Sequence, residues 1–327
     1  MTAKRYLVTG GTGFIGAALV RRLVADGAIV RVLDNNSRGA LRRLDGILDD
    51  VDLVEGDIRD AEAVRKAAAG ADSVLHLAYV NGTRFFYEQP ELVLDVGVKG
   101  MINVLDACRH HDIGELVLAS SSEVYQTPPD VPTDERAPLS VPDPLNPRYS
   151  YGGGKIISEL MALNYGRTGF ERVMVFRPHN VYGPDMGWEH VVPEFALRLA
   201  ALPPAGGPHP FPIQGTGDET RAFVHIDDFC DAIATVLDKG RHLEIYHVGN
   251  DEEVSVAYLA QAAAAALGRS IAIVPGRLQP GGTLRRCPDI SRLRSLGFSP
   301  SRPLATGLPP VVLWYESNRH LAPKDQS

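Results

Sequence analysis

A tyrosine and a lysine stand four residues apart, at Tyr151 and Lys155, downstream of a glycine-rich segment at residues 9–16. On a helix, positions i and i+4 share one face, so the ammonium would lie beside the phenol. A nearby positive charge favours the phenolate, and we expect it to lower the pKa of Tyr151 below its usual value of about 10. Such a phenol can take a proton from a sugar hydroxyl while the carbon beneath it gives hydride to a nicotinamide.

The glycine-rich segment places Gly10, Gly13 and Gly16 between an apolar run and a helical pattern. The first glycine suits a tight turn, the second a close approach to a pyrophosphate, and the third close helix–strand packing. The N-terminus of the following helix adds free N–H groups and a positive dipole end. The segment therefore predicts a dinucleotide-binding turn, with Phe14 and Ile15 also at the cofactor.

Two carboxylates are placed to contact the same dinucleotide. Asp34 ends the second predicted strand, 18 residues beyond Gly16, where a carboxylate binds a ribose 2′-OH and repels a 2′-phosphate. This favours NAD over NADP, although Asp34 could instead form a turn and Arg38 could accept a phosphate. Asp57 follows the third strand and either holds the adenine amine or caps the next helix.

Short apolar runs alternate with helical patterns through the first part of the chain. Strands are predicted at 5–8, 28–33, 51–54, 73–77 and 116–119, and helices at 14–25, 61–69 and from Pro90 toward His111. Apolar strands separated by helices indicate a parallel sheet that is covered on both faces. We therefore predict an α/β fold with a doubly wound parallel sheet.

The second half of the chain is less regular. Weak strands are predicted at 172–176 and 245–248, and helices near 190–201, 227–238, 255–267 and 304–315. Residues 126–147 hold seven prolines, which exclude a helix or a central strand and predict a loop within a domain. We expect an NAD-binding Rossmann domain over 1–178, with a returning segment at about 222–248. A smaller mixed α/β substrate-binding domain, interleaved with it, would take 179–327.

Composition restricts the classes of partner. The formal net charge of −7 over 327 residues argues against a nucleic-acid or anionic-membrane surface. The three cysteines are widely spaced, which is typical of buried thiols in a reducing compartment. Neither a secretion signal nor a membrane-spanning run is recognisable, so a cytoplasmic enzyme is expected, and we predict no metal site.

Together these motifs resemble the extended short-chain dehydrogenase/reductase family, specifically its nucleotide-sugar epimerases, dehydratases and decarboxylases. The likeness covers nearly the whole chain. It rests on residues 9–16, Asp34, 56–58, 76–78, 120–125, Tyr151 with Lys155, 177–184, 215–223 and 286–289. The resemblance implies NAD as cofactor, with Ile58, Leu77 and Ala78 among its contacts.

The resemblance also implies roles at the reacting end. Tyr151 would be the base, Lys155 would bind the nicotinamide ribose, and Ser121 would share the hydrogen bond of the sugar hydroxyl. The substrate, a nucleotide-diphosphate sugar, would contact Ser122, Asn180, Arg221 and Arg286. Arginine's planar fork suits phosphate oxygens. A homodimer is implied, in which the helix after Pro90 and the 151–167 helix form a four-helix bundle.

The chain departs from the family pattern at three positions. Gln126 stands where many relatives have glycine, and Gly97 stands where a helical asparagine is common. His179 replaces an aromatic or small residue, and it acts either as an acid or in packing.

A 4-keto sugar has three fates: reduction from its other face, loss of the C6 hydroxyl, or loss of a C6 carboxylate. Glu123 stands where dehydratases and decarboxylases of the family carry a working carboxylate, whereas Ser122 replaces the acid of dTDP-glucose dehydratases. We predict a 4-epimerase that recycles bound NAD. A 4,6-dehydratase or a decarboxylase using Glu123 remains the alternative. An NADPH-dependent ketoreductase and a non-catalytic NAD-binding regulator are less favoured.

Overall fold

The computed structural model of the protein describes residues 3–204, 206–277 and 283–322. Its main element is a parallel sheet with the strand order β11-β6-β5-β4-β1-β2-β3. The strands are β1 (Arg5–Thr9), β2 (Ile29–Asp34), β3 (Val51–Glu55), β4 (Ser73–His76), β5 (Glu115–Ala119), β6 (Arg172–Pro178) and β11 (Glu244–Val248). The order reverses between β1 and β4, so the predicted doubly wound fold is confirmed.

Helices cover both faces of this sheet, which is why its strands are apolar on both sides. One face carries α1 (Phe14–Ala25) and α8 (Ile226–Lys239), which contact each other, and the other carries α2 (Ala61–Ala68), α5 (Gly100–His110) and α6 (Ser150–Tyr165). Two neighbouring residues of β1 pack against the helices on opposite faces of the sheet: Val8 packs with α1, and Leu7 packs with α2 and α5. This double cover holds the carboxyl ends of the strands in a fixed arrangement.

The helix expected from Pro90 toward His111 is confirmed, and it contains one π-helical turn. The chain forms α3 (Thr83–Glu88), α4 (Pro90–Leu94), a π-helical turn over Asp95–Lys99, and then α5. The π-helical turn contains Gly97, and a Cβ atom there would lie 2.1 Å from the hydroxyl of Tyr79. The side chain of Tyr79 therefore enters the space beside the turn, and π-helical turns of this kind are frequent at functional sites.

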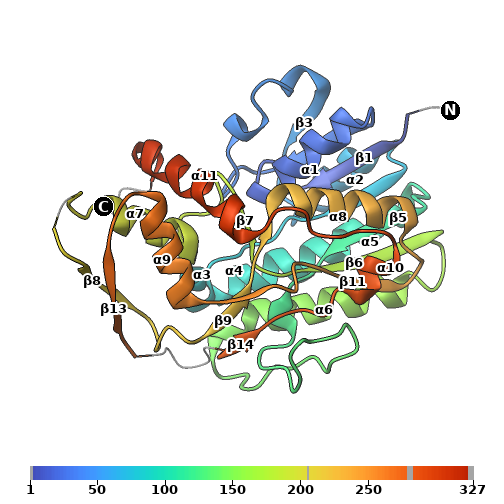
Figure 1. The fold of residues 1–327 in the computed structure, drawn as a ribbon. Coiled ribbons are helices and arrows are strands. Elements are labelled where there is room, and N and C mark those ends of the chain that lie inside the picture. The colour runs from blue at the N-terminus through green and yellow to red at the C-terminus, as the bar shows by residue number, and fades with distance from the viewer. Residues whose placement is uncertain (1–2, 205, 278–282, 323–327) are drawn as a thin grey trace.

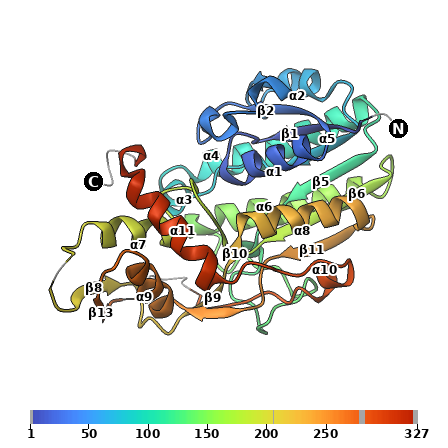
Figure 2. The same ribbon diagram turned by 45° about the horizontal axis from the view of Figure 1, so that its top comes forward.

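A smaller mixed α/β region lies at one end of the sheet, as Figure 2 shows. Its strands are β7 (Val181–Tyr182), β8 (His209–Ile213), β9 (Thr220–Ala222), β10 (Val224–His225), β12 (Glu253–Ser255), β13 (Ile271–Pro275) and β14 (Arg285–Arg286). Its helices are α7 (Val191–Ala200), α9 (Val256–Ala266) and α11 (Leu304–Ser317), while α10 (Ser291–Ser295) contacts β11. Phe195, Leu259 and Leu308 belong to its separate hydrophobic core. Among the described residues, no helix has the length and apolar character needed to cross a bilayer.

Candidate active site

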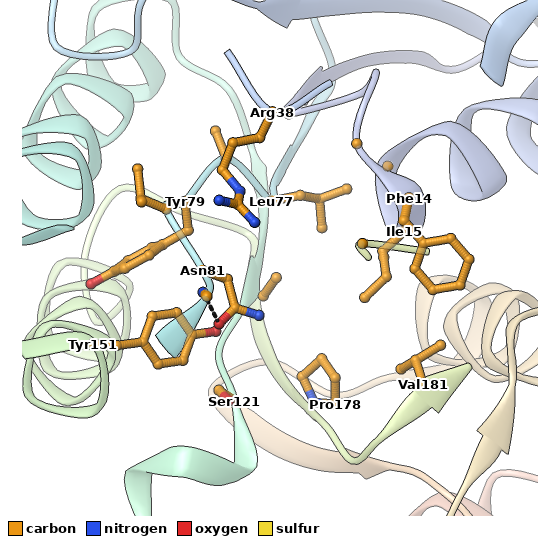
Figure 3. A pocket seen from close by; sticks show the side chains of 18 of the residues that line it. Phe14, Ile15, Arg38, Leu77, Tyr79, Asn81, Ser121, Tyr151, Pro178 and Val181 are labelled. Carbon is orange, nitrogen blue, oxygen red and sulfur yellow. Dashed lines mark hydrogen bonds between the residues drawn. The ribbon is translucent and has the colours of Figure 1, made fainter. Parts of the chain in front are cut away.

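One pocket runs along the carboxyl ends of the strands and reaches the smaller region. Figure 3 shows Phe14 and Ile15 on one side of it and Tyr151 with Ser121 on the other. The predicted site residues that line it are Gly10, Gly13, Phe14, Ile15, Gly16, Asp34, Asp57, Ile58, Leu77, Ala78, Ser121, Ser122, Glu123, Tyr151, Lys155, Asn180 and Arg286. Arg221 is not among the lining residues.

The glycine-rich turn has the close backbone contacts that its sequence predicts. Gly10 has a φ of +75°, and a Cβ atom there would lie 2.8 Å from the backbone of Ala78. A Cβ atom at Gly16 would lie 2.0 Å from the carbonyl oxygen of Gly10. Gly13 caps α1 and has no side chain to bond the first N–H groups of the helix. These groups and the positive end of the helix dipole suit a pyrophosphate, so the turn fits the predicted dinucleotide.

Asp34 is the last residue of β2, and Asp57 follows the neighbouring strand β3. The carboxylate of Asp34 accepts hydrogen bonds from the backbone N–H of Thr12 at 3.0 Å and of Asn36 at 2.9 Å. Asp57 forms an ion pair with Arg59 at 2.7 Å, which lowers the pKa of Asp57 to about 2. Helix α2 is instead capped by Asp60, so the capping alternative for Asp57 is wrong.

Helix α6 presents Tyr151 and Lys155 to the pocket. The Nζ atom of Lys155 donates to the carbonyl oxygen of Ala119 at 2.6 Å and lies 3.9 Å from the ring centroid of Tyr79. Burial lowers the pKa of Lys155 to about 7, and the charge of Glu159 opposes this shift. The lysine is therefore held at the end of β5 by one carbonyl and one aromatic face.

The expected effect of Lys155 on Tyr151 is not what the structure shows. Burial raises the pKa of Tyr151, a hydrogen bond with Ser121 opposes that rise, and the charge of Glu123 adds to it. The ring of Tyr151 stacks on Phe86 at a centroid distance of 5.0 Å, and Nζ of Lys155 is 5.8 Å from its centroid. The pKa of Tyr151 is raised where we expected Lys155 to lower it, because desolvation is the larger effect.

Glu123 belongs to the short 3-10 turn Ser122–Val124, which Ser121 caps by accepting from the Glu123 N–H at 3.1 Å. Its carboxylate forms an ion pair with Arg286. Burial alone would raise the pKa of Glu123, but Arg286, Arg148 and Arg221 outweigh it and leave that pKa lowered. The pocket therefore contains a paired, charged carboxylate next to Ser122.

The predicted substrate-binding residues come from four segments, and Ser122 belongs to the 3-10 turn described above. Asn180 follows β6, and its side-chain amide donates to the Ala222 carbonyl at 2.9 Å. Arg221 and Arg286 are register partners in the β9–β14 pair. Arg221 donates to the Thr283 carbonyl at 2.7 Å and supports this strand pair beside the pocket, whereas Arg286 lines the pocket itself.

A buried polar network fixes the segment between β5 and the 3-10 turn. Ser120 donates to Glu159, and the same carboxylate accepts from Arg177 at 2.6 Å and 2.8 Å. Arg177 also donates to the hydroxyl of Tyr125. A buried ion pair with its hydrogen bonds satisfied holds one geometry well. The network therefore ties α6 to the segment that carries the three serines.

The departure at position 126 has a local structural consequence. Gln126 has a φ of +54°, in the left-handed region that glycine adopts most easily. Its side-chain amide donates to the Glu123 carbonyl at 2.5 Å, a bond that glycine could not make. The glutamine thus fastens the 3-10 turn while its backbone is strained.

His179 has a packing role. The residue is 1% exposed, its ring lies 4.7 Å from the ring of His247, and it does not line the pocket. Burial keeps the pKa of His179 well below its usual value of 6.5. A neutral ring outside the pocket does not serve as an acid for a bound substrate.

Sequence reasoning missed Arg148, Tyr79 and the pocket segment at 186–192. The Nε atom of Arg148 is buried and has no hydrogen-bond partner among the residues that the structure describes. Arg148 stands three residues before Tyr151, one helical turn away, and that spacing could have identified it. Tyr79 follows β4 in a loop and carries no periodic signal. Within the described ranges, no group of three His, Cys, Asp or Glu could hold a metal ion.

Comparison with known proteins places this pocket in a family. Residues 6–249 match the NAD dependent epimerase/dehydratase family. The chain is 34% identical to a dTDP-4-dehydro-6-deoxy-D-allose reductase of Streptomyces bikiniensis, over 96% of this chain and 98% of the relative. The crystal structure of a dTDP-glucose 4,6-dehydratase of Streptomyces venezuelae with NAD and TYD bound aligns with a TM-score of 0.85 and 32% identity, covering 99% of this chain and 100% of that one.

A UDP-glucose 4-epimerase of Thermus thermophilus in complex with NAD aligns with a TM-score of 0.82 and 29% identity, covering 97% of this chain and 100% of that one. These proteins carry out three different reactions on one fold, so the comparisons support the family and its cofactor rather than a single activity. The predicted family resemblance and the NAD prediction are both confirmed at this level. The chain belongs to the NAD-dependent epimerase/dehydratase family of enzymes.

Proposed function

We propose that the protein is a nucleotide-sugar 4-epimerase. It would oxidise the C4 hydroxyl of the sugar to a transient ketone and reduce that ketone from the opposite face. Arg221, which does not line the pocket, and Glu123, which balances charge here, have other roles than predicted, and the remaining site residues named from the sequence keep theirs in this proposal. The smaller region, with residues 179–327 interleaved as predicted, would bind the nucleotide sugar, and residues 1–178 with 222–248 would bind the cofactor.

In this proposal Tyr151 takes the proton of the C4 hydroxyl and later returns it, and Ser121 shares the hydrogen bond. Bound oxidised NAD would supply the hydride acceptor and a positive ring charge, which would favour the phenolate against the effect of burial. Lys155, held by the Ala119 carbonyl, adds a second positive charge on the same helix face. Arg286 and Asn180 would position the diphosphate.

The observation that carries the choice of reaction is the state of Glu123. Loss of the C6 hydroxyl requires a free acid to protonate the leaving group. Ser122, the neighbour of Glu123, has no acidic group. The Glu123 carboxylate is paired with Arg286, and the pKa of Glu123 is lowered. A carboxylate that is paired with arginine and whose pKa is lowered suits charge balance at the pocket better than proton transfer to a leaving hydroxyl.

The experiment is incubation of the NAD-loaded protein with UDP-, GDP-, CDP- and dTDP-sugars in heavy water, followed by mass spectrometry and NMR. The expected product has the mass of the substrate and the opposite configuration at C4. Loss of water with deuterium uptake would establish a dehydratase instead, and loss of CO2 a decarboxylase. In a parallel incubation with added NADPH, its net consumption would establish a reductase, the activity named for the Streptomyces bikiniensis relative.

We also propose that the protein forms a homodimer through α5 and α6. These helices expose apolar side chains that the chain itself leaves uncovered: Ile102, Ile157, Leu160 and Tyr165. Burying such a patch against a second copy would be favourable, since exposed apolar groups that gather on one face mark interfaces. Light scattering after size exclusion tests this, because Leu160→Arg should yield monomers while Leu313→Arg, an exposed leucine on α11, should not.

A further inference from the structure

Tyr79 packs against both members of the Tyr151–Lys155 pair, although it lies 72 or more residues before them in the chain. Its ring centroid is 3.9 Å from Nζ of Lys155 and 5.1 Å from the ring of Tyr151, which it meets edge to face at 84°. Figure 3 shows Tyr79 beside Tyr151 at the pocket wall. The position of this one ring is therefore coupled to both side chains.

Two glycines on different helical segments make room for Tyr79. A Cβ atom at Gly97, in the π-helical turn, would lie 2.1 Å from the Tyr79 hydroxyl, and a Cβ atom at Gly154, on α6, would lie at the same distance. Any larger residue at either position would displace the ring. Gly97, a departure from the family pattern, thus belongs to a slot for the tyrosine.

The hydroxyl of Tyr79 does not explain why the slot exists. It is buried and has no hydrogen-bond partner among the residues that the structure describes. Burial raises the pKa of Tyr79, so the phenol is neutral. A buried unpaired hydroxyl destabilises a protein, so the ring is the part with a favourable contact. Its face attracts the Lys155 ammonium through a cation–π interaction.

We propose that Tyr79 is a positioning residue for the pair: its ring face holds the charged Lys155 against the Ala119 carbonyl, and its edge-to-face contact fixes the ring of Tyr151. This rests on the proposed function only in so far as Tyr151 and Lys155 do the chemistry. The other groups that face Lys155 are Glu159 from its own helix and His76 at the end of β4. Burial lowers the pKa of His76 to about 3, so that imidazole is neutral, and Tyr79 and Glu159 are what favour the charged lysine.

The test compares Tyr79→Phe with Tyr79→Met in the full-length, NAD-loaded protein. Phenylalanine keeps the ring and removes the unpaired hydroxyl, whereas methionine fills similar volume without an aromatic face. The pKa of Lys155 is measured by NMR of ¹³C-labelled lysine, with Lys155→Met used for assignment. We expect Tyr79→Phe to leave this pKa unchanged and Tyr79→Met to lower it, because the loss of the ring disfavours the charged form.

Where a substrate turns over, Tyr79→Met should lower kcat by about tenfold with little change in KM, and Tyr79→Phe should stay within about twofold. The alkaline limb of the rate profile should move to lower pH in Tyr79→Met alone. Equal losses in the two variants would assign the effect to the hydroxyl and overturn the proposal. An unchanged Lys155 pKa in Tyr79→Met would also overturn it.

A double-mutant cycle on stability tests the slot without any substrate. Gly97→Ala should lower the Tm markedly when Tyr79 is present and much less in Tyr79→Leu, because the clash needs the ring. Additive effects would show that the ring does not occupy the slot. If no sugar reacts while the lysine pKa responds as expected, the proposed function fails and the role of Tyr79 stands.

Discussion

The Glu123 carboxylate and the Arg286 guanidinium form an ion pair across 163 positions of the chain. The contact joins the 3-10 turn after β5 to β14, and β14 is paired with the strand that carries Arg221. Arg286 also donates to the Thr283 hydroxyl at 3.1 Å. The ion pair of Glu123 thus helps to hold the smaller region against the sheet at the pocket.

This pair leads to a test of the reaction through Glu123→Gln. Glutamine keeps the shape and still accepts a hydrogen bond from Arg286, so an epimerase should lose less than about tenfold in kcat. A general acid or base contributes about 10² to 10⁴-fold, so a dehydratase or decarboxylase that uses this carboxylate should lose at least about a hundredfold. The measurement is steady-state turnover of the identified sugar, with Glu62→Gln, an exposed glutamate of α2, as the matched control.

Replacing Tyr151 by phenylalanine should remove the proton acceptor while leaving the surroundings in place. The ring can keep its stacking on Phe86 and its edge contact with Tyr79. We expect kcat/KM to fall by about 10² to 10⁴-fold with no change in the Kd of NAD by calorimetry. A variant with full turnover would contradict the role of this phenol, and one with lost NAD binding would point to a structural defect instead.

The carboxylate of Asp34 should determine the choice between NAD and NADP. It is oriented by the backbone N–H groups of Thr12 and Asn36, and Arg38 lines the same pocket. Asp34→Ala removes the acceptor for a 2′-OH and the repulsion of a 2′-phosphate, so the Kd of NAD should rise about tenfold and that of NADP should fall. Calorimetry with both dinucleotides measures this. An unchanged preference would assign the carboxylate to the turn alone.

The first half of the fold could be predicted closely because its signals are local. The helix Phe14–Ala25 has the predicted bounds, and β1 extends the predicted strand by one residue to Thr9. The long helix after Pro90 lies where the sequence predicts it, but its π-helical turn over Asp95–Lys99 could not be predicted, since Tyr79 approaches Gly97 there from a distant loop. Sequence periodicity carries no information about such a tertiary contact.

The positions of the site residues could be predicted where a sequence motif relates them. Properties that depend on burial, such as a pKa, could not. The glycine turn and the Tyr151–Lys155 spacing identify residues that do line one pocket. The pKa of Tyr151 could not be predicted, because it depends on how tightly Phe86 and its neighbours enclose the ring. Arg221 belongs to a specific sequence motif, yet its side chain donates to the Thr283 carbonyl. The direction of this side chain follows from the pairing of β9 with β14, which the spacing of residues in the sequence does not reveal.

The buried Lys155 should make stability depend on pH in a defined window. Its pKa is lowered to about 7, whereas a lysine in the unfolded chain titrates near 10.5, so between these values the unfolded state binds more protons. The free energy of unfolding should therefore rise as pH increases from 7 toward 9. Burial raises the pKa of Cys108 above its unfolded value of 9, so this thiol changes the free energy of unfolding only at higher pH. It does not obscure the effect of Lys155 between pH 7 and 9.

Lys155→Met is the variant that isolates this effect, because it fills similar space without a charge to bury. At pH 7 it should be more stable than the parent protein, and the difference should shrink as the pH approaches 9. Urea unfolding at several pH values measures both curves, with Lys66→Met on the exposed face of α2 as control. Parallel curves for the parent and Lys155→Met would contradict a lowered pKa, and would mean that the Ala119 carbonyl, Glu159 and the Tyr79 ring fully offset the burial of the ammonium.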